Sequence, residues 1–181
     1  MLQKKVNAIG TPFWDFIMKY LTHCGDGIFA LIIMLVYLKI RIRTTILLLI
    51  SFLSTAVIVQ ILKHAVFQTM KRPYAYLETD PDFRRIEDFT YHTANSFPSG
   101  HAASIFALCT VLAFQYKNHI SLQIGLALFA ITVAFTRVYL CQHFPQDIIA
   151  GSLIGTLVGY YTCVLLTSKL MHLDKPMWTT K

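Results

Sequence analysis

Five long runs of apolar residues divide the chain, and polar residues gather between them. The runs cover residues 25–38, 44–62, 102–114, 120–135 and 148–167. A transmembrane helix needs about 20 predominantly apolar residues, so each run is a candidate span, with flanking residues extending the shorter first and third runs. We therefore expect an all-α fold, an integral membrane bundle of five transmembrane helices, with six as the alternative.

A shorter amphipathic segment precedes the first run. Residues 13–20 contain Asp15 and Lys19 and are too short and too charged to cross a bilayer. We expect them to form an interfacial helix with Trp14 and Tyr20 at the depth of the lipid headgroups. The length of 181 residues is typical of a single domain, so residues 1–181 are expected to form one membrane-embedded unit.

Composition supports this interpretation. Hydrophobic residues make up 55% of the chain and charged residues 14%, whereas soluble proteins carry about 25% charged residues. The net charge of +7 is dispersed between the apolar runs. A dispersed surplus argues against nucleic-acid binding, which favours one basic patch. Nothing in the chain indicates an obligatory protein partner, so the expected surroundings are the lipid bilayer.

Loop charges predict the orientation of the bundle. With five spans, one face receives the basic residues Lys39, Arg41, Arg43, Lys117, Lys169, Lys175 and Lys181. The positive-inside tendency makes that face cytoplasmic, although Lys4, Lys5 and Lys19 fall on the other side. We expect a protein of the bacterial inner membrane whose connections 63–101 and 137–147 face the periplasm or exterior.

These two outward connections hold the most suggestive polar groups. Lys63 and Arg72 follow the second run, Ser99, Gly100 and His101 open the third, and residues 136–147 link the fourth to the fifth. Ionisable groups at membrane depth are costly and usually serve a function. Three distant segments thus bring cations, two histidines, an aspartate and a helix N-terminus to one level.

This combination is suited to binding a phosphoryl group. Arginine offers paired donors to phosphate oxygens and lysine adds a point charge. The helix that begins at Ser99 presents unpaired N–H groups and a favourable dipole to an anion, and Gly100 lets the backbone approach it closely. No carboxylate-histidine cluster with metal-binding spacing occurs, so neither a metal nor another cofactor is expected.

The two histidines are expected to divide the chemistry. His143 lies four residues before Asp147, a spacing at which the carboxylate accepts the Nδ1–H and leaves Nε2 free as a nucleophile. His101, on another helix, is placed to donate a proton to the departing oxygen.

At this point the chain resembles a known family. Lys63…Arg72-Pro73, Pro98-Ser99-Gly100-His101 and Arg137-x5-His143-x3-Asp147 are similar, in order, to the three-part signature of the type 2 phosphatidic acid phosphatases, shared with vanadium-dependent haloperoxidases. The resemblance implies metal-independent dephosphorylation of a lipid phosphate through a phosphohistidine. It implies His143 as nucleophile, Asp147 as its orienting partner and His101 as general acid. The implied phosphate-binding residues are Lys63, Arg72, Ser99, Gly100 and Arg137. Prenyl diphosphate, phosphatidylglycerol phosphate, phosphatidic acid and lipid A phosphate are all compatible substrates.

The chain departs from the family pattern at two positions. Eight residues separate Lys63 from Arg72, whereas the family's first motif has six. Nine positions along a helix rotate the side chain by about 180°, so both cations reach one phosphate only if the helix ends between them, near Gln68-Thr69. Thr136 stands where the family usually has serine, which keeps a hydroxyl there.

Other interpretations remain open at this stage. A phosphotransferase would use another alcohol in place of water to resolve the phosphohistidine, and a haloperoxidase would bind vanadate in the same pocket. Five apolar spans argue against the haloperoxidase. A small anion transporter would distribute Lys63, Arg72 and Arg137 along a pore, whereas here they cluster at one face.

The outer loop and the scattered histidines receive simpler interpretations. Arg84 and Arg85 are expected to pair with nearby carboxylates of a solvated loop, with headgroup recognition as the alternative. The candidate partners are Asp82, Glu87 and Asp88. Interfacial or loop positions are expected for His23, His64, His92, His119 and His172.

Overall fold

The computed structural model describes residues 2–174, and every regular element in this part of the chain is helical. The elements are α1 (Leu2–Ala8), α2 (Pro12–Leu21), η1 (Thr22–Gly25), α3 (Gly27–Ile40), α4 (Ile42–Ile61), η2 (Leu62–Val66), α5 (Tyr74–Leu77), α6 (Gly100–Gln115), α7 (Ile120–Tyr139), α8 (Pro145–Leu166) and η3 (Met171–Leu173). The expected all-α bundle is confirmed, and each of the five apolar runs forms a helix. Lys175 and Lys181, which contributed to the predicted orientation, lie outside the described residues.

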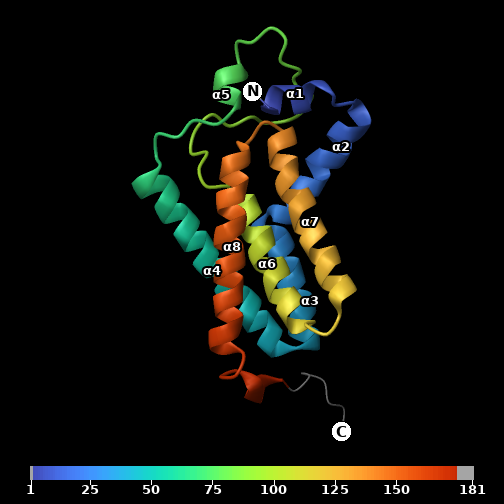
Figure 1. The fold of residues 1–181 in the computed structure, drawn as a ribbon, viewed down its shortest axis with the longest axis vertical. Coiled ribbons are helices and arrows are strands. Elements are labelled where there is room, and N and C mark those ends of the chain that lie inside the picture. The colour runs from blue at the N-terminus through green and yellow to red at the C-terminus, as the bar shows by residue number, and fades with distance from the viewer. Residues whose placement is uncertain (1, 175–181) are drawn as a thin grey trace.

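The long helices form one bundle with distinct ends. Figure 1 shows α1, α5 and the connection from α4 to α6 at one end, and the C-terminal end of α8 at the other. The connection between α7 and α8 lies at the same end as α1, so the polar segments predicted to share one face do share one end of the bundle.

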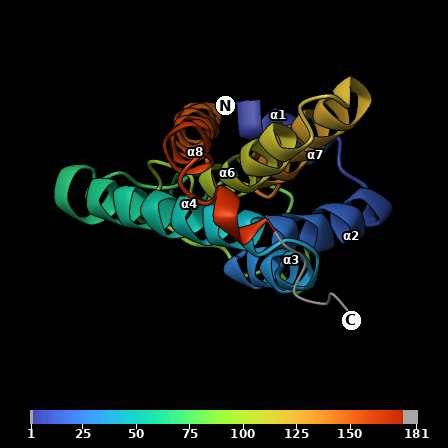
Figure 2. The same cartoon turned by 90° about the horizontal axis from the view of Figure 1, so that it is seen from below.

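Helix α6 is the centre of the bundle and packs against α3, α4, α7 and α8 (Figure 2). Its closest neighbour is α8, which presents Gly151, Gly155 and Gly159 at four-residue intervals. A Cβ atom on Gly151 or Gly155 would collide with the backbone carbonyl of Ser99 or Ala103 on α6. Small residues allow this close approach of membrane helices, and it brings the N-termini of α6 and α8 together.

Apolar side chains cover the outside of the bundle as well as its core. Leu47, Ile105 and Val133 are buried between helices, whereas Leu53 and Leu157 are among many large apolar residues that point outward. An outward apolar surface on this scale is typical of helices that face lipid.

The helices of the bundle are less uniform in length than the five spans expected. Within residues 2–174, three helices are long and apolar enough to cross a membrane, namely Ile42–Val66, Ile120–Tyr139 and Pro145–Leu166. Pro12–Gly25 and Gly27–Ile40 make a fourth if the pair, bent by 59°, is one broken span. Gly100–Gln115 is apolar but has only 16 residues. Five spans and the interfacial role of α2 therefore stay predictions, since α2 is also the first limb of the bent pair.

Candidate active site

The three polar segments meet at the end of the bundle that carries α1 and α5. Lys63 lies on η2, Arg72 on the loop after it, Ser99, Gly100 and His101 at the start of α6, Arg137 in the last turn of α7, His143 just before α8 and Asp147 in its first turn. The structure thus brings together side chains separated by up to 84 positions in the sequence.

His143 and Asp147 form a buried pair. The Nδ1 atom of His143 lies 3.4 Å from Oδ2 of Asp147, and each residue is 1% exposed. The same oxygen accepts hydrogen bonds from the Ser96 hydroxyl at 2.5 Å and the Phe144 backbone N–H at 2.9 Å. These bonds fix the carboxylate, and with Nδ1 at Asp147 the second ring nitrogen, Nε2, is left to react.

The environment of His143 favours the neutral imidazole. His143 lies in the loop between α7 and α8. Burial lowers the pKa of His143 well below its ordinary value, and the positive charges of Arg72 and Arg137 lower it further. A neutral ring keeps the lone pair that a nucleophile needs at neutral pH.

A tight backbone reversal places this histidine beside Arg137. The backbone N–H groups of Gln142 and His143 donate to the carbonyl of Arg137 at 2.9 and 3.1 Å. Cys141, at the reversal, has a φ of 52°, a left-handed conformation that is uncommon for a residue with a side chain. The chain therefore doubles back directly after α7 and returns His143 to the level of the arginine.

Both arginines are held by neutral partners. Arg72 donates from Nε to the Ala94 carbonyl at 2.8 Å and from Nη1 to Oε1 of the buried Gln142 at 2.9 Å. Arg137 donates from Nη1 to Oγ1 of Thr22 at 2.8 Å. The Nε of Arg137 is buried and has no hydrogen-bond partner among the described residues. A buried charged donor without a partner is costly, and an anion oxygen would satisfy it.

The helix that carries Lys63 ends before Arg72. Their nine-position separation requires this end if both cations are to reach one phosphate. Helix α4 passes into the single π-helical turn η2, which contains Lys63 and ends at Val66. The end falls two residues earlier than expected, and π-helical turns are frequent at functional sites. The half-buried Lys63 interacts electrostatically with Arg72, Arg137 and Asp147.

The start of α6 has the geometry of an anion-binding terminus. Ser99 is fully buried, caps the helix by accepting from the Ala102 N–H at 3.4 Å, and donates its own N–H to the Asp147 carbonyl at 3.0 Å. A Cβ at Gly100 would make only an ordinary contact with Val59 at 3.8 Å. Packing within the protein therefore does not require glycine at this position.

Thr136 makes its side-chain hydrogen bond within α7. The Thr136 hydroxyl donates to the Val133 carbonyl at 2.6 Å and is thus committed to its own helix.

A cavity of about 550 Å³ opens beside the site. It is lined by Thr22, His23, His92, His101, Arg137 and Gln142, among others. Within residues 2–174, no group of three or more histidine, cysteine, aspartate or glutamate side chains is arranged to hold a metal.

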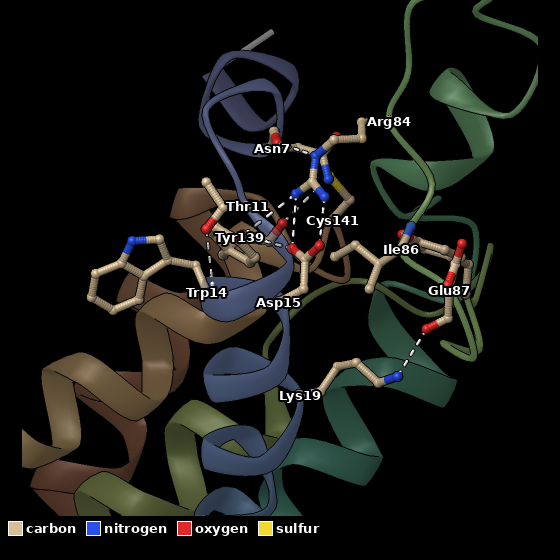
Figure 3. Close-up of polar contacts among 11 residues, drawn as sticks. Asn7, Thr11, Trp14, Asp15, Lys19, Arg84, Ile86, Glu87, Tyr139 and Cys141 are labelled. Carbon is tan, nitrogen blue, oxygen red and sulfur yellow. Dashed lines mark hydrogen bonds and ion pairs between the residues drawn. The ribbon is translucent and has the colours of Figure 1, made fainter.

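The expected pairing of Arg84 with its neighbouring carboxylates is wrong. Arg84 forms a two-point ion pair with Asp15 on α2, at 2.5 and 2.8 Å, and the Tyr139 hydroxyl donates to the same carboxylate at 2.7 Å (Figure 3). Arg85 donates to the Glu78 carbonyl at 2.8 Å. The reason is that α2 lies against this loop, a contact that local sequence does not reveal.

Comparison with known proteins identifies the family. A family model described as the PAP2 superfamily matches residues 44–170. The chain belongs to the PAP2 superfamily. The matched range includes the eight PAP2 site residues expected from the sequence and excludes Thr22, which holds Arg137.

Two bacterial lipid A phosphatases are among the curated relatives of this PAP2 chain. The chain is 38% identical over 84 residues to a lipid A 4'-phosphatase of Bacteroides thetaiotaomicron, covering 45% of this chain and 36% of that protein. It is 33% identical over 85 residues to a lipid A 1-phosphatase of Rhizobium etli, covering 43% of this chain and 35% of that protein. The match thus spans little more than a third of each relative.

Two solved structures match over most of the chain. The crystal structure of Aquifex aeolicus LpxE superposes with a TM-score of 0.75 at 25% identity, covering 90% of this chain and 93% of that one. A transmembrane PAP2-type phosphatidylglycerolphosphate phosphatase of Bacillus subtilis superposes with a TM-score of 0.72 at 22% identity, covering 92% and 83%. The fold is therefore that of membrane-embedded PAP2 proteins.

Sequence reasoning missed four residues that contact the expected site. Gln142 lies inside the third signature segment, next to His143, and Ser96 lies two positions before the second segment, so nearness to the signature was the available signal. Thr22 and Asp26 lie far from the signature, and no local pattern marks them.

Proposed function

We propose that this chain is an integral-membrane lipid phosphate phosphatase that hydrolyses a phosphomonoester or diphosphate headgroup through a phosphohistidine. The observation that carries the proposal is the buried His143–Asp147 pair beside Lys63, Arg72 and Arg137, with a buried Arg137 donor that lacks a partner among the described residues. This arrangement combines a nucleophile with charge to neutralise the phosphoryl oxygens.

The proposed reaction has two steps. In the first, Nε2 of His143 attacks phosphorus, the bond to the lipid oxygen breaks, and His101 donates a proton to that oxygen. In the second, His101 removes a proton from water, whose oxygen attacks the phosphohistidine and releases phosphate and the free ring. Asp147 orients the nucleophile and stabilises the positive ring.

The remaining predicted residues bind the phosphoryl group. Lys63, Arg72 and Arg137 neutralise its oxygens. The Ser99 hydroxyl and the N-terminal backbone N–H groups of α6 add donors, and the space beside Gly100 admits the anion. This role explains a glycine that packing within the protein does not require.

The proposed substrate is a phosphorylated membrane lipid. The names of the lipid A phosphatases among the relatives fit a lipid A type of headgroup, and the name of another relative, a putative undecaprenyl-diphosphatase of Escherichia coli, fits a prenyl diphosphate. Prenyl diphosphate, phosphatidylglycerol phosphate and phosphatidic acid remain in the same class. The clustering of the cations at one end of the bundle favours this enzyme over a small anion transporter.

Phosphate release from detergent-solubilised protein tests the proposal. A panel of the four lipid phosphates should yield inorganic phosphate with no added metal and with a chelator present. A requirement for an added divalent cation, or transport of anions without hydrolysis, would contradict the proposed function. Transfer to an added alcohol in place of water would identify the phosphotransferase variant.

The proposed orientation places the site on the periplasmic or exterior side. Thr79 lies in the long connection at the site end of the bundle and Asn118 in the short connection between α6 and α7, and both are exposed. A membrane-impermeant thiol reagent added to intact cells should therefore label Thr79→Cys and leave Asn118→Cys unlabelled. The opposite labelling pattern would reverse the orientation.

Lys63 is predicted to bind phosphate, and the neighbouring Lys71 is not. Lys63 is half-buried and interacts with Arg72, Arg137 and Asp147, whereas Lys71 is exposed. Lys63→Ala should raise KM and lower kcat by about tenfold or more, since a desolvated cation on phosphate contributes roughly 1.5–3 kcal/mol. Lys71→Ala, the matched control, should change kcat/KM much less. A larger loss with Lys71→Ala would show that the first motif is misaligned.

A further inference from the structure

The chain between α2 and α3 brings a carboxylate to His101. Asp26 stands at the bend between the two helices, and its Oδ1 lies 2.6 Å from Nε2 of His101. Its other oxygen, Oδ2, lies at hydrogen-bonding distance, 2.7 Å, from Nδ1 of His23. Asp26 is thus held between two histidines, one of them at the proposed site of reaction.

Residues next to Asp26 make direct contact with the same site. The Gly25 backbone lies so close to His101 that a Cβ at Gly25 would come within 2.9 Å of the His101 Cβ. Three positions earlier, Thr22 accepts the hydrogen bond from Arg137 at 2.8 Å. The short segment η1 and the bend after it therefore touch two of the proposed site residues.

Helix α2 is anchored in a way that fixes this segment. Figure 3 shows Asp15 of α2 between Arg84 of the outer loop and Tyr139 at the end of α7. Arg84 also donates from Nε to the Asn7 carbonyl at 2.9 Å, and Lys19 donates to the Glu87 carbonyl at 2.8 Å. These contacts tie the helix that leads into η1 to the loop and to the helix that carries Arg137.

The charges around His101 explain why a carboxylate is needed there. Burial opposes a positive charge on the ring most strongly, Arg137 and Arg72 oppose it further, and Asp26 is the acidic group that acts against all three. A general acid has to carry its proton when the leaving oxygen departs. A carboxylate at ion-pair distance from one ring nitrogen stabilises the protonated ring and orients the other nitrogen.

We propose that Asp26 is the positioning residue of His101. It holds the protonated imidazole by Nε2 so that Nδ1–H faces the departing lipid oxygen. The N-terminal segment, which lies outside residues 44–170 matched by the family model, thereby completes the active site. This proposal rests on the proposed function, specifically on His101 as general acid.

Leaving-group dependence tests the role of Asp26. Asp26→Asn keeps the shape and removes the charge, and it should lower kcat about 10- to 100-fold on an alkyl lipid phosphate but less than about threefold on p-nitrophenyl phosphate, whose anion departs without a proton. The double variant with His101→Ala should be no slower than His101→Ala alone, because both changes remove the same function. Asp26→Glu should restore part of the lost rate.

Two further variants keep the test decisive. Asp80→Asn removes a carboxylate from the Lys4 ion pair, away from the site, and should leave both rates unchanged. If Asp26→Asn does not fold, Gly25→Ala should give the same selectivity, because its Cβ pushes the bend away from His101.

The outcomes separate the two proposals. If His101→Ala is selective for alkyl substrates while Asp26→Asn and Gly25→Ala lose equal activity on both, Asp26 has only a structural role. If His101→Ala itself shows no selectivity, the general-acid role in the proposed function fails, and the role of Asp26 fails with it.

Discussion

Replacing His143 with alanine should abolish turnover of every phosphate ester, activated or not. The proposed covalent step needs the Nε2 lone pair whatever group departs, so no choice of leaving group compensates for its loss. We expect a fall of about 10⁴-fold or more, to the level of the uncatalysed background. The rate of phosphate release from a lipid phosphate and from p-nitrophenyl phosphate measures this fall in turnover.

A matched histidine variant controls for the substitution itself. His119 lies between α6 and α7, away from the site end of the bundle, and His119→Ala should keep the rate of the unaltered protein. Substantial turnover by folded His143→Ala on either substrate would contradict the assignment of the nucleophile.

His101→Ala should distinguish substrates where His143→Ala does not. A general acid contributes about 10²–10⁴-fold when the departing oxygen is strongly basic, as in a lipid alcohol. It contributes little for p-nitrophenol, which leaves as an anion. We therefore expect a loss in that range on the alkyl lipid phosphate and a small one on p-nitrophenyl phosphate. Equal losses on both substrates would exclude His101 as the acid.

Much of the fold could be predicted because its signals are local. Each of the five apolar runs became a helix, and the rotation argument for Lys63 and Arg72 correctly required a helix end between them. The number of spans was harder to predict, because α6 has only 16 residues and α2 joins α3 at a 59° bend. The third apolar run was itself short, which left its span uncertain, and no run length indicates a bend.

The spacing of the signature predicted that its residues would share one end of the bundle, as they do, but it did not predict the contacts that hold them. Arg84 pairs with Asp15, 69 residues away, although carboxylates stand within a few positions of it. Arg137 is held by Thr22 across 115 residues. Such contacts depend on how α2 docks onto the bundle. Periodicity and spacing describe one segment at a time and carry no information about docking.

Trapping the phosphorylated enzyme is the most direct test of the phosphohistidine mechanism. Protein denatured in alkali during turnover of a phosphate-labelled lipid should retain label on His143, and protein quenched in acid should lose it, because the N–P bond is acid-labile. His143→Ala should carry no label under either condition. Label that persists in His143→Ala, or that survives acid in the unaltered protein, would contradict a phosphohistidine at His143.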